Sequence, residues 1–342
     1  MSLTVGRARE LTASLLEAAG LPADNAEVTA EAIVLADIWG VGSHGLIRLP
    51  FYLERTLAGG YPADAKLVTV TDTGPAVTLD GGGGLGHWQL SRAADLAVER
   101  CQAFGIAAVG VGNSGHCGAL GVYTLAPLRA GQLTLVFSNG PAVMPPWDGA
   151  RPLLSTSPLA AGIPSRPKPA IIDLASSTVA RGKIAAAAKR GQPLPDGWAF
   201  DRHGRPTSDP DEALAGMLAP LGGAKGYALA LLVEALSGAL VGPALSSDVT
   251  DMFRPEDAAR PQRIGHLVVT LDPRRYDVEG GNRAQARFDE LARRVEDAGG
   301  RLPGSRRTLP DEIDMGAPLP LARQLEDELA AWAERFGVGT RS

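Results

Sequence analysis

The sequence predicts an α+β fold (mixed α/β), in which helices from both chain ends form one unit beside a central sheet. The 342 residues are 45% hydrophobic and 21% charged, which suits two domains that each bury a core. Helical patterns occupy both ends, and short strand patterns separated by turns occupy the middle. The 42 glycines and 26 prolines indicate many tight turns. We therefore expect a helical domain of residues 1–72 with 300–342, and a sheet domain of residues 73–299.

The first 60 residues predict helices. An apolar stripe at helical spacing (Leu11, Leu15 and Leu16) precedes a Gly-Leu-Pro turn, and a second apolar run follows that turn. Near residue 67 the pattern changes to two short strands around a turn at residues 73–75. The sheet is expected to begin there.

The central region predicts a helix over residues 87–104, ended by Gly105, and a series of buried strands. Residues 141–169 are too rich in proline for regular structure over much of their length, so we expect a long functional loop there. The expected buried strands cover residues 106–112, 133–140, 170–177 and 266–273.

The last third of the chain predicts three helices. Residues 211–241 contain a turn at 221–223, followed by an apolar helix that we expect to be buried on nearly all sides. Residues 286–300 predict a surface helix, and residues 321–337 predict an amphipathic helix. Helices at both termini make one shared helical domain the simplest arrangement.

Composition excludes several classes of protein. The net charge of -5 without a basic stripe argues against nucleic-acid binding, and no apolar run is long enough to cross a bilayer. The N-terminus lacks the apolar core of a signal peptide, so we expect a cytoplasmic protein. Cys101 and Cys117 are too few for a disulfide framework, and no metal-type spacing of Cys or His occurs.

Gly81, Gly83 and Gly86 match the dinucleotide-binding fingerprint G-x-G-x-x-G, between a predicted strand and a predicted helix. A Rossmann site also requires an acidic residue at the end of the following strand, where it binds the ribose. Here that strand ends at residues 110–113 without a carboxylate. We interpret the glycines as a turn.

The densest polar cluster lies at residues 42–52. If residues 43–57 form one helix, His44, Arg48, Tyr52 and Arg55 share a face. Imidazole exchanges protons near neutral pH, and arginine binds a carboxylate through two parallel hydrogen bonds. The pattern suits proton transfer on an organic acid. The alternative is a solvated helix face on which His44 is a capping residue.

Two further clusters follow predicted strands. His116, in the small-residue segment 112–118, is expected to contact a ligand, with Cys117 as a packing residue; the alternative is a structural turn histidine. Asp173 ends an apolar strand, where a buried carboxylate requires a partner such as an imidazole. The alternative is a carboxylate that caps the following residues.

Cationic side chains accompany two glycine turns. Lys225, one of only five lysines, lies between glycines before the apolar helix and suits a phosphate or carboxylate, although the P-loop spacing is absent. Arg306 and Arg307 follow a Pro-Gly turn and could meet a cofactor phosphate. The alternative is that both arginines are solvated.

Taken together, these segments resemble the malate/L-lactate dehydrogenase family, which is unrelated to the Rossmann lactate dehydrogenases. The family also includes ureidoglycolate and sulfolactate dehydrogenases, diketogulonate reductase, and reductases of piperideine-2-carboxylate and pyrroline-2-carboxylate. The segments that carry the resemblance, in family order, are ADIWGVGSHGLIRLPFYL, VGNSGHCGA, SNGPAVMPPW, STSPLAAGIP, IIDLASSTVARGKI, LPDGWAFDRHGRPTSDP, LGGAKGYALALLVE and RLPG.

The resemblance implies a non-Rossmann, largely antiparallel NAD(P)-binding sheet domain, a helical domain from both termini, and a homodimer. It implies hydride transfer between NAD(P)H and a small carboxylic acid substrate, a 2-oxo or 2-imino acid. By resemblance His44 exchanges the proton with the substrate, and Asp173 orients the His44 ring. Arg48 is implied to bind the substrate carboxylate, and His116 to lie beside the nicotinamide. Tyr52 and Asn139 are implied to contact substrate. The implied cofactor contacts are Ser43, Ile171, Ile172, Asp173, Leu174, Ala175, Ser176, Ser177, Ala224, Lys225, Gly304, Ser305 and Arg306.

Three departures from the family pattern concern the substrate and the cofactor. Trp39 stands where many members have arginine, and Ser157 stands where many have asparagine. Ser305 replaces a common glutamate and precedes two arginines, which favours NADP over NAD. We therefore expect a 2-oxo acid reductase or 2-hydroxy acid dehydrogenase. A cyclic imine reductase is the nearest alternative, and a non-catalytic nucleotide-binding protein of the same fold is another.

Overall fold

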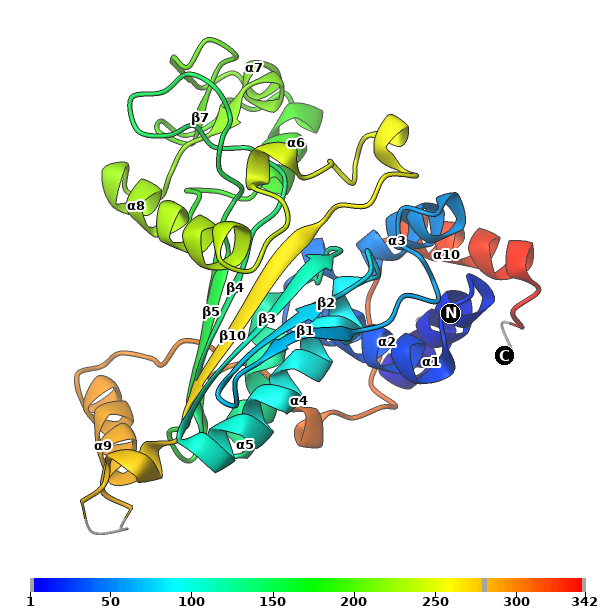
Figure 1. Cartoon of the computed structure of the whole chain (residues 1–342). Coiled ribbons are helices and arrows are strands. Elements are labelled where there is room, and N and C mark those ends of the chain that lie inside the picture. The colour runs from blue at the N-terminus through cyan, green and yellow to red at the C-terminus, as the bar shows by residue number, and fades with distance from the viewer. Residues whose placement is uncertain (1–2, 279–281, 340–342) are drawn as a thin grey trace.

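A seven-stranded sheet runs through the molecule and separates its lobes (Figure 1). The structure is a computed structural model that describes residues 3–278 and 282–339. In spatial order the strands are β1 (Val68–Asp72), β2 (Ala76–Asp80), β3 (Ile106–Ser114), β10 (Ile264–Leu271), β4 (Leu133–Ser138), β5 (Leu159–Ile163) and β6 (Ala170–Leu174). Every neighbouring pair is antiparallel except β2 and β3. The expected non-Rossmann, largely antiparallel sheet is confirmed.

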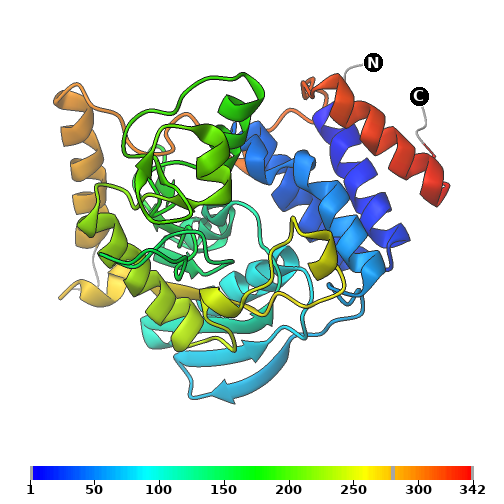
Figure 2. The same cartoon turned by 90° about the horizontal axis from the view of Figure 1, so that it is seen from above.

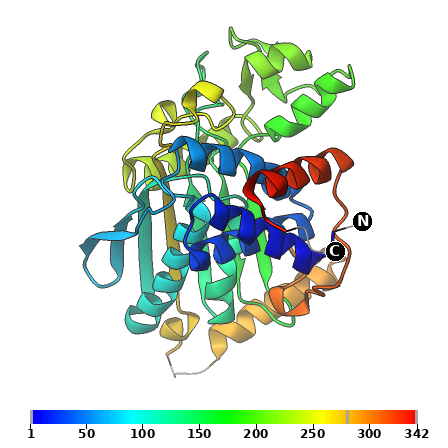
Figure 3. The ribbon, with the colours of Figure 1, turned by 90° about the vertical axis from the view of Figure 1, so that its right-hand side faces the viewer.

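Helices from both chain ends pack in one core at the side of the sheet (Figure 3). They are α1 (Val5–Ala18), α2 (Ala23–Ile38), α3 (Leu49–Ala58) and α10 (Arg323–Phe336). Leu329 and Trp332 of α10 join Leu15 and Leu16 of α1 in that core. An isolated bridge between Thr4 and Pro318 ties the two ends together. Figure 2 shows α10 lying beside α1.

Helix α4 (Gly86–Phe104) connects the parallel pair β2 and β3 and covers one face of the sheet, together with α5 (Leu125–Arg129). The helix ends at Gly105, whose positive φ of 84° allows the left-handed cap. On the other face lie α8 (Ala224–Val233) and the π-helix η4 (Glu234–Ala239). Val233 of α8 and Val241, which follows η4, share an apolar core with Leu267 of β10. Helix α9 (Arg283–Asp297) lies at the far end of the sheet (Figure 1).

A small lobe above the sheet contains elements that the sequence pattern did not predict. Its core joins Met144 and Leu154 to Ile184 and Leu218. Its elements are α6 (Arg181–Lys189), β7 (Ala199–Phe200), β8 (Pro206–Thr207), α7 (Pro210–Ala215) and β9 (Met217–Leu218). Very short strands carry little periodicity, which explains why the sequence did not reveal them. The remaining 3-10 turns are η1 (Gly42–His44), η2 (Leu46–Arg48), η3 (Leu120–Thr124), η5 (Ser246–Asp248), η6 (Pro255–Asp257), η7 (Pro273–Tyr276) and η8 (Pro310–Glu312).

The prediction of a loop holds over much of residues 141–169, where β5 is the one named strand and lies between β4 and β6. The prediction for the apolar helix was wrong. Helix α8 is not buried on nearly all sides of the single chain: Leu231 and Leu232 are about half exposed, at 47% and 52%. An apolar helix face left open in one chain points to a further contact. Among the described residues, no helix has the length and apolar character needed to cross a bilayer.

The glycine-rich segment 81–86 is a packed turn, as expected. A Cβ atom on Gly81 would lie 2.3 Å from the side-chain oxygen of Gln89, and one on Gly86 would lie 2.2 Å from the carbonyl oxygen of Gly115. These glycines allow protein segments to approach one another closely, and they form no cradle for a diphosphate.

Candidate functional site

The polar cluster at residues 42–52 is not carried by one helix. Two short 3-10 turns, η1 with His44 and η2 with Arg48, precede α3, which begins at Leu49. The condition of one continuous helix over residues 43–57 is therefore not met, because Gly45 (φ -90°, ψ -149°) interrupts it. Arg55 also lies apart from the site: it is buried and donates to the carbonyl oxygens of Asp257 and Arg260.

Packing nevertheless brings three of the predicted site residues together. The rings of His44 and His116 are stacked, with centroids 5.7 Å apart and an interplanar angle of 9°. The Tyr52 hydroxyl lies 2.8 Å from Nδ1 of His116, and the backbone N–H of Gly118 donates to the same nitrogen at 3.2 Å. Nδ1 of His116 is thus an acceptor, so Tyr52 donates and the neutral ring carries its proton on Nε2.

Burial keeps this cluster uncharged. It lowers the pKa of His44 to about 4, with a further contribution from the nearby positive charge of Arg48. It also lowers the pKa of His116 well below its ordinary value, and His44 adds to that effect. The pKa of Tyr52 is raised well above its ordinary value, again mainly by burial. At neutral pH the site therefore holds neutral imidazoles that can accept a proton.

Two more histidines, His87 and His266, lie beside this cluster, and neither was selected from the sequence. His87 packs its edge on Tyr52, with centroids 4.9 Å apart, and neither ring nitrogen has a hydrogen-bond partner among the described residues. His266 on β10 lies 3.1 Å from the carbonyl oxygen of Gly115 through Nε2, which must therefore donate. Four of the five histidines in the sequence converge here. In the sequence, the small number of histidines is the only feature that could have indicated that they share one site.

Arg48 presents unused donors beside the imidazoles. Its Nε donates to the carbonyl oxygen of Ser43 at 2.7 Å, and its guanidinium stacks on Phe253 at 4.5 Å from the ring centroid. Neither terminal amino group has a hydrogen bond to a described residue. The Ser43 hydroxyl lies 3.0 Å from Nδ1 of His44. A fixed guanidinium with free donors next to a neutral imidazole suits an organic anion.

We expected Asp173 to pair with His44, but its carboxylate has other partners. Its carboxylate accepts from the backbone N–H of Gly121 at 3.0 Å and lies 3.9 Å from Arg307. Burial raises its pKa, while the Gly121 hydrogen bond and Arg307 oppose that shift. Among the hydrogen bonds of the described residues, His44 has Ser43 rather than Asp173 beside its ring. The partners of the Asp173 carboxylate are Gly121 on η3 and Arg307 in the C-terminal segment.

Trp39, one departure from the family pattern, contacts an arginine of the segment that follows another departure, Ser305. The guanidinium of Arg307 stacks on the Trp39 ring at 4.6 Å, and the Trp39 indole donates to the carbonyl oxygen of Thr308 at 2.9 Å. The third departure, Ser157, has a positive φ of 42°. Asparagine adopts that conformation more readily than serine.

The three predicted cofactor segments lie side by side along β6. The backbone N–H of Ile171 donates to Pro303 at 2.9 Å, so the turn at 304–306 adjoins the start of this strand. The backbone N–H of Leu221 donates to the carbonyl oxygen of Ser176 at 2.8 Å. The turn that precedes Lys225 therefore lies beside the C-terminal end of β6. Lys225 is exposed at the N-terminus of α8, whose cap Gly223 offers no side chain to the free N–H groups.

This arrangement fits a nicotinamide dinucleotide. Uncapped N–H groups beside a lysine suit its phosphates, and the buried Nη1 of Arg307 has no partner among the described residues. A cavity of about 540 Å³ adjoins Ser305, but its lining is of mixed charge. Its cations Arg166, Lys168 and Arg293 are all ion-paired, and the carboxylates Asp289 and Glu296 also line it. No group of His, Cys, Asp or Glu among the described residues could hold a metal ion.

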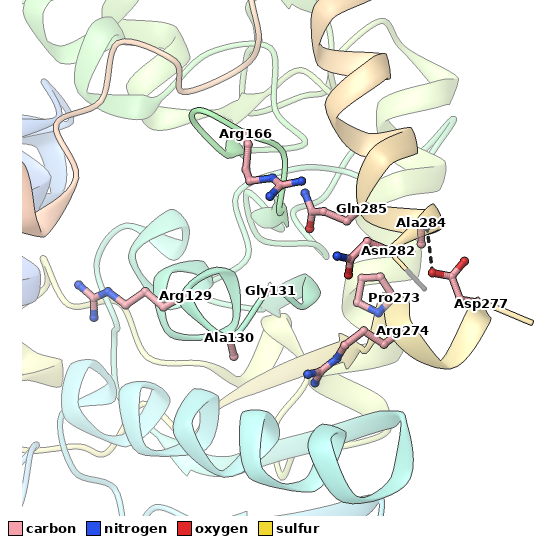
Figure 4. A pocket seen from close by; sticks show the side chains of 10 residues that line it. All are labelled: Arg129, Ala130, Gly131, Arg166, Pro273, Arg274, Asp277, Asn282, Ala284 and Gln285. Carbon is pink, nitrogen blue, oxygen red and sulfur yellow. Dashed lines mark hydrogen bonds between the residues drawn. The ribbon is translucent and has the colours of Figure 1, made fainter. Parts of the chain in front are cut away.

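Asn139 and one further pocket lie outside this reactive cluster. The buried side chain of Asn139 donates to Ala244 and accepts from Gly265, both at 2.9 Å, which makes it a structural link; contact with substrate stays a prediction. Figure 4 shows a pocket of about 330 Å³ between α5, η7 and α9. It contains three arginines, two of which are paired with Asp289 and Asp272, and none of the predicted site residues.

Comparison with known proteins agrees with this geometry. The statistical description of the malate/L-lactate dehydrogenase family matches residues 3–324. The chain belongs to this family. It is 40% identical to the (2R)-3-sulfolactate dehydrogenase (NADP(+)) of Chromohalobacter salexigens, over 97% of this chain and 98% of that protein. It is 31% identical to the Delta(1)-pyrroline-2-carboxylate/Delta(1)-piperideine-2-carboxylate reductase of Pseudomonas aeruginosa, over 97% and 99%.

Solved family structures share the fold. Sulfolactate dehydrogenase from Methanocaldococcus jannaschii superposes with a TM-score of 0.90 at 27% identity, covering 99% of this chain and 98% of that one. The delta1-piperideine-2-carboxylate reductase from Pseudomonas syringae gives 0.88 at 30% identity, covering 97% and 100%. As a family member this protein is an NAD(P)-dependent oxidoreductase.

Proposed function

We propose that the protein interconverts a small 2-oxo acid and its 2-hydroxy acid. The observation that carries the proposal is the neutral His44 stacked on His116, next to an Arg48 guanidinium with free donors. When bound, NAD(P)H supplies the hydride. Arg48 binds the substrate carboxylate and fixes its orientation. His44 gives the proton to the oxygen during reduction and takes it back during oxidation.

In the free site His44 is neutral at pH 7, because burial lowers its pKa to about 4. A neutral imidazole is the protonation state that takes the hydroxyl proton in the oxidation direction. In the reduction direction the bound acid brings a negative charge near the ring, and this charge raises the proton affinity of His44. His116, which is hydrogen-bonded to Tyr52, stacks on His44 and supports the orientation of its ring. We propose that Asp173 acts on the site only through Gly121.

Relatives support a substrate with a second anionic group. Four of the similar proteins are named sulfolactate dehydrogenases, from Chromohalobacter, Methanothermobacter, Methanothermus and Methanocaldococcus. The Methanothermus protein is also named a malate dehydrogenase. We propose 3-sulfolactate and malate as the first hydroxy acids to try. NADP is the proposed cofactor, supported by the NADP(+)-dependent relative and by the acid-free turn Ser305–Arg306.

A substrate panel tests the proposal. Full-length protein is mixed with NADH or NADPH and with pyruvate, oxaloacetate, 3-sulfopyruvate or piperideine-2-carboxylate, and loss of nicotinamide absorbance is followed. We expect turnover of at least one 2-oxo acid and a higher kcat/KM with NADPH. Turnover of the cyclic imine alone would establish the second candidate, which the two piperideine-2-carboxylate reductase relatives support. Tight cofactor binding without any turnover would leave a nucleotide-binding protein.

We also propose a cytoplasmic homodimer. Both cysteines are buried and unpaired, which suits a reducing compartment. Helix α8 and η4 leave an apolar face open, with Leu229, Leu231 and Leu232 at 40–52% exposure and Leu240 at 70%. The whole segment 224–240 carries only two charged residues, Lys225 and Glu234. A second copy of the chain would cover that face.

The double substitution Leu231→Lys with Leu232→Lys is expected to convert the dimer to a monomer. Two ammonium groups in the centre of an apolar interface cannot be desolvated without a large loss of binding free energy. Light scattering after size-exclusion chromatography gives the mass. Leu291→Lys is the matched control, because Leu291 is equally exposed (53%) but lies on the charged helix α9. A wild-type chain that elutes as a monomer would refute the proposed dimer.

A further inference from the structure

The carboxylate of Asp37, on the last turn of α2, lies inside the loop that carries His44. Its Oδ2 accepts the backbone N–H of Leu46 at 2.7 Å. A Cβ atom on Gly45 would lie 2.1–2.3 Å from three carboxylate atoms, and one on Gly42 would lie 3.2 Å from Oδ1. Residues 42–46 are thus folded around this side chain, and the two glycines are what allow it to enter.

The other hydrogen bonds of this loop are local: the backbone N–H groups of His44 and Gly45 donate to Val41 and Gly42, and Arg48 donates to Ser43. His44 ends η1 and Leu46 begins η2, and each 3-10 turn has only three residues. Such short turns have poor hydrogen-bond geometry and hold their shape weakly by themselves. The hydrogen bond from Leu46 to Asp37 connects the start of η2 to α2, and the Leu46 side chain is itself buried in the helical core. His44 lies two residues before this anchor.

From this geometry we infer that Asp37 is a positioning residue for His44: it sets the path of residues 42–46 and thereby the stacking of His44 on His116. The inference rests on the proposed role of His44 in proton transfer. Asp37 itself acts through Gly45 and Leu46, and it takes no part in the chemical step. Sequence reasoning gave it no role, because an aspartate near the end of a helix carries no signal by itself.

Ionisation of Asp37 distinguishes a positioning role from a merely structural one. A carboxylate accepts a backbone hydrogen bond more strongly than a neutral carboxyl group does. Burial raises the pKa of Asp37 to about 6, and the Leu46 hydrogen bond opposes that shift. The titratable group that the loop presents is His44, whose pKa of about 4 lies well below. A decline in kcat near pH 6 that is present in wild type and absent from Asp37→Asn would therefore report Asp37, because His44 is the same in both proteins.

Substitution of Asp37 tests the inference in the full-length enzyme with NADP(H). We expect Asp37→Ala to lower kcat by about 10- to 100-fold, with cofactor affinity within twofold of wild type in a fluorescence titration. Asp37→Asn keeps an acceptor for Leu46 and cannot ionise, so it should recover most of kcat and lose the decline near pH 6. Asp272→Asn is the matched control, since Asp272 also accepts a backbone N–H, from Arg274, at a distant 3-10 turn.

Two outcomes would overturn the inference: full kcat in Asp37→Ala, or an unchanged acid decline in Asp37→Asn. If Asp37→Ala does not fold, the pH profile of Asp37→Asn decides alone. The His44 ring signal in a histidine-labelled NMR spectrum, assigned by its loss in His44→Gln, gives a readout independent of turnover. It should shift in the Asp37 variants and not in Asp272→Asn. A wild-type chain without turnover would refute the proposed function, whereas an unshifted His44 signal would refute only the positioning role.

Discussion

His44→Ala is expected to lower kcat for reduction of a 2-oxo acid by about 10²- to 10⁴-fold, the range that a positioned proton donor contributes. The ring stacks on His116 and has Ser43 beside Nδ1, so its other nitrogen is the one left for substrate. Steady-state kinetics with saturating cofactor measure the effect. Substrate affinity should change less than kcat, because Arg48 still binds the carboxylate.

His203→Ala controls for the loss of a histidine as such, because His203 is exposed in the small lobe. With a cyclic imino acid the loss in His44→Ala should be smaller, since an imine nitrogen carries its proton before the hydride arrives. A decrease in kcat of less than tenfold in His44→Ala with a 2-oxo acid would contradict the role of His44. His116 would then be the candidate for proton transfer.

Stability is expected to fall steeply as the pH drops from 7 to 5. Burial lowers the pKa of His87 to about 3 and of His266 to about 4, while an unfolded histidine titrates near 6.5. The unfolded chain therefore binds more protons below pH 6.5, and the free energy of unfolding decreases from there down to the folded pKa values. Each such histidine costs about 2 kcal/mol at pH 5, at 1.4 kcal/mol for each pH unit. His44 and His116 add to the same decline.

His87→Phe isolates one of these contributions. Neither nitrogen of His87 has a described partner, so an aromatic ring of similar shape loses no hydrogen bond. Urea unfolding of wild type and variant at pH 7 and pH 5 gives both free energies. We expect the variant to be about as stable as wild type at pH 7 and more stable by about 2 kcal/mol at pH 5. An identical pH dependence in both proteins would show that His87 is not buried as a neutral ring.

The elements that could be predicted from sequence are those whose secondary structure follows from the spacing of their own apolar residues and from their end caps. The buried strand β3 and the helix α4 with its Gly105 cap follow local periodicity, and both formed where expected. Scarcity also helped, because His44, His116 and Lys225 were few enough to be weighed one by one.

What could not be predicted depends on distant packing. The break at Gly45 requires the carboxylate of Asp37, eight residues earlier and on another helix. The partner of Asp173 is Gly121 rather than His44 because η3 lies beside the end of β6. His87 and His266 reach the site from α4 and β10, which no spacing in the sequence connects. The exposed face of α8 looked like core because the pattern of one chain does not distinguish a core from an interface.

The shared helical bundle has a consequence for the order of folding. Leu319, Leu329 and Trp332 complete the apolar core of α1 to α3, although the whole sheet domain separates these segments in the sequence. Contacts of such long sequence separation form late and slow the completion of folding. We therefore expect the N-terminal helices to expose apolar surface until α10 docks on them.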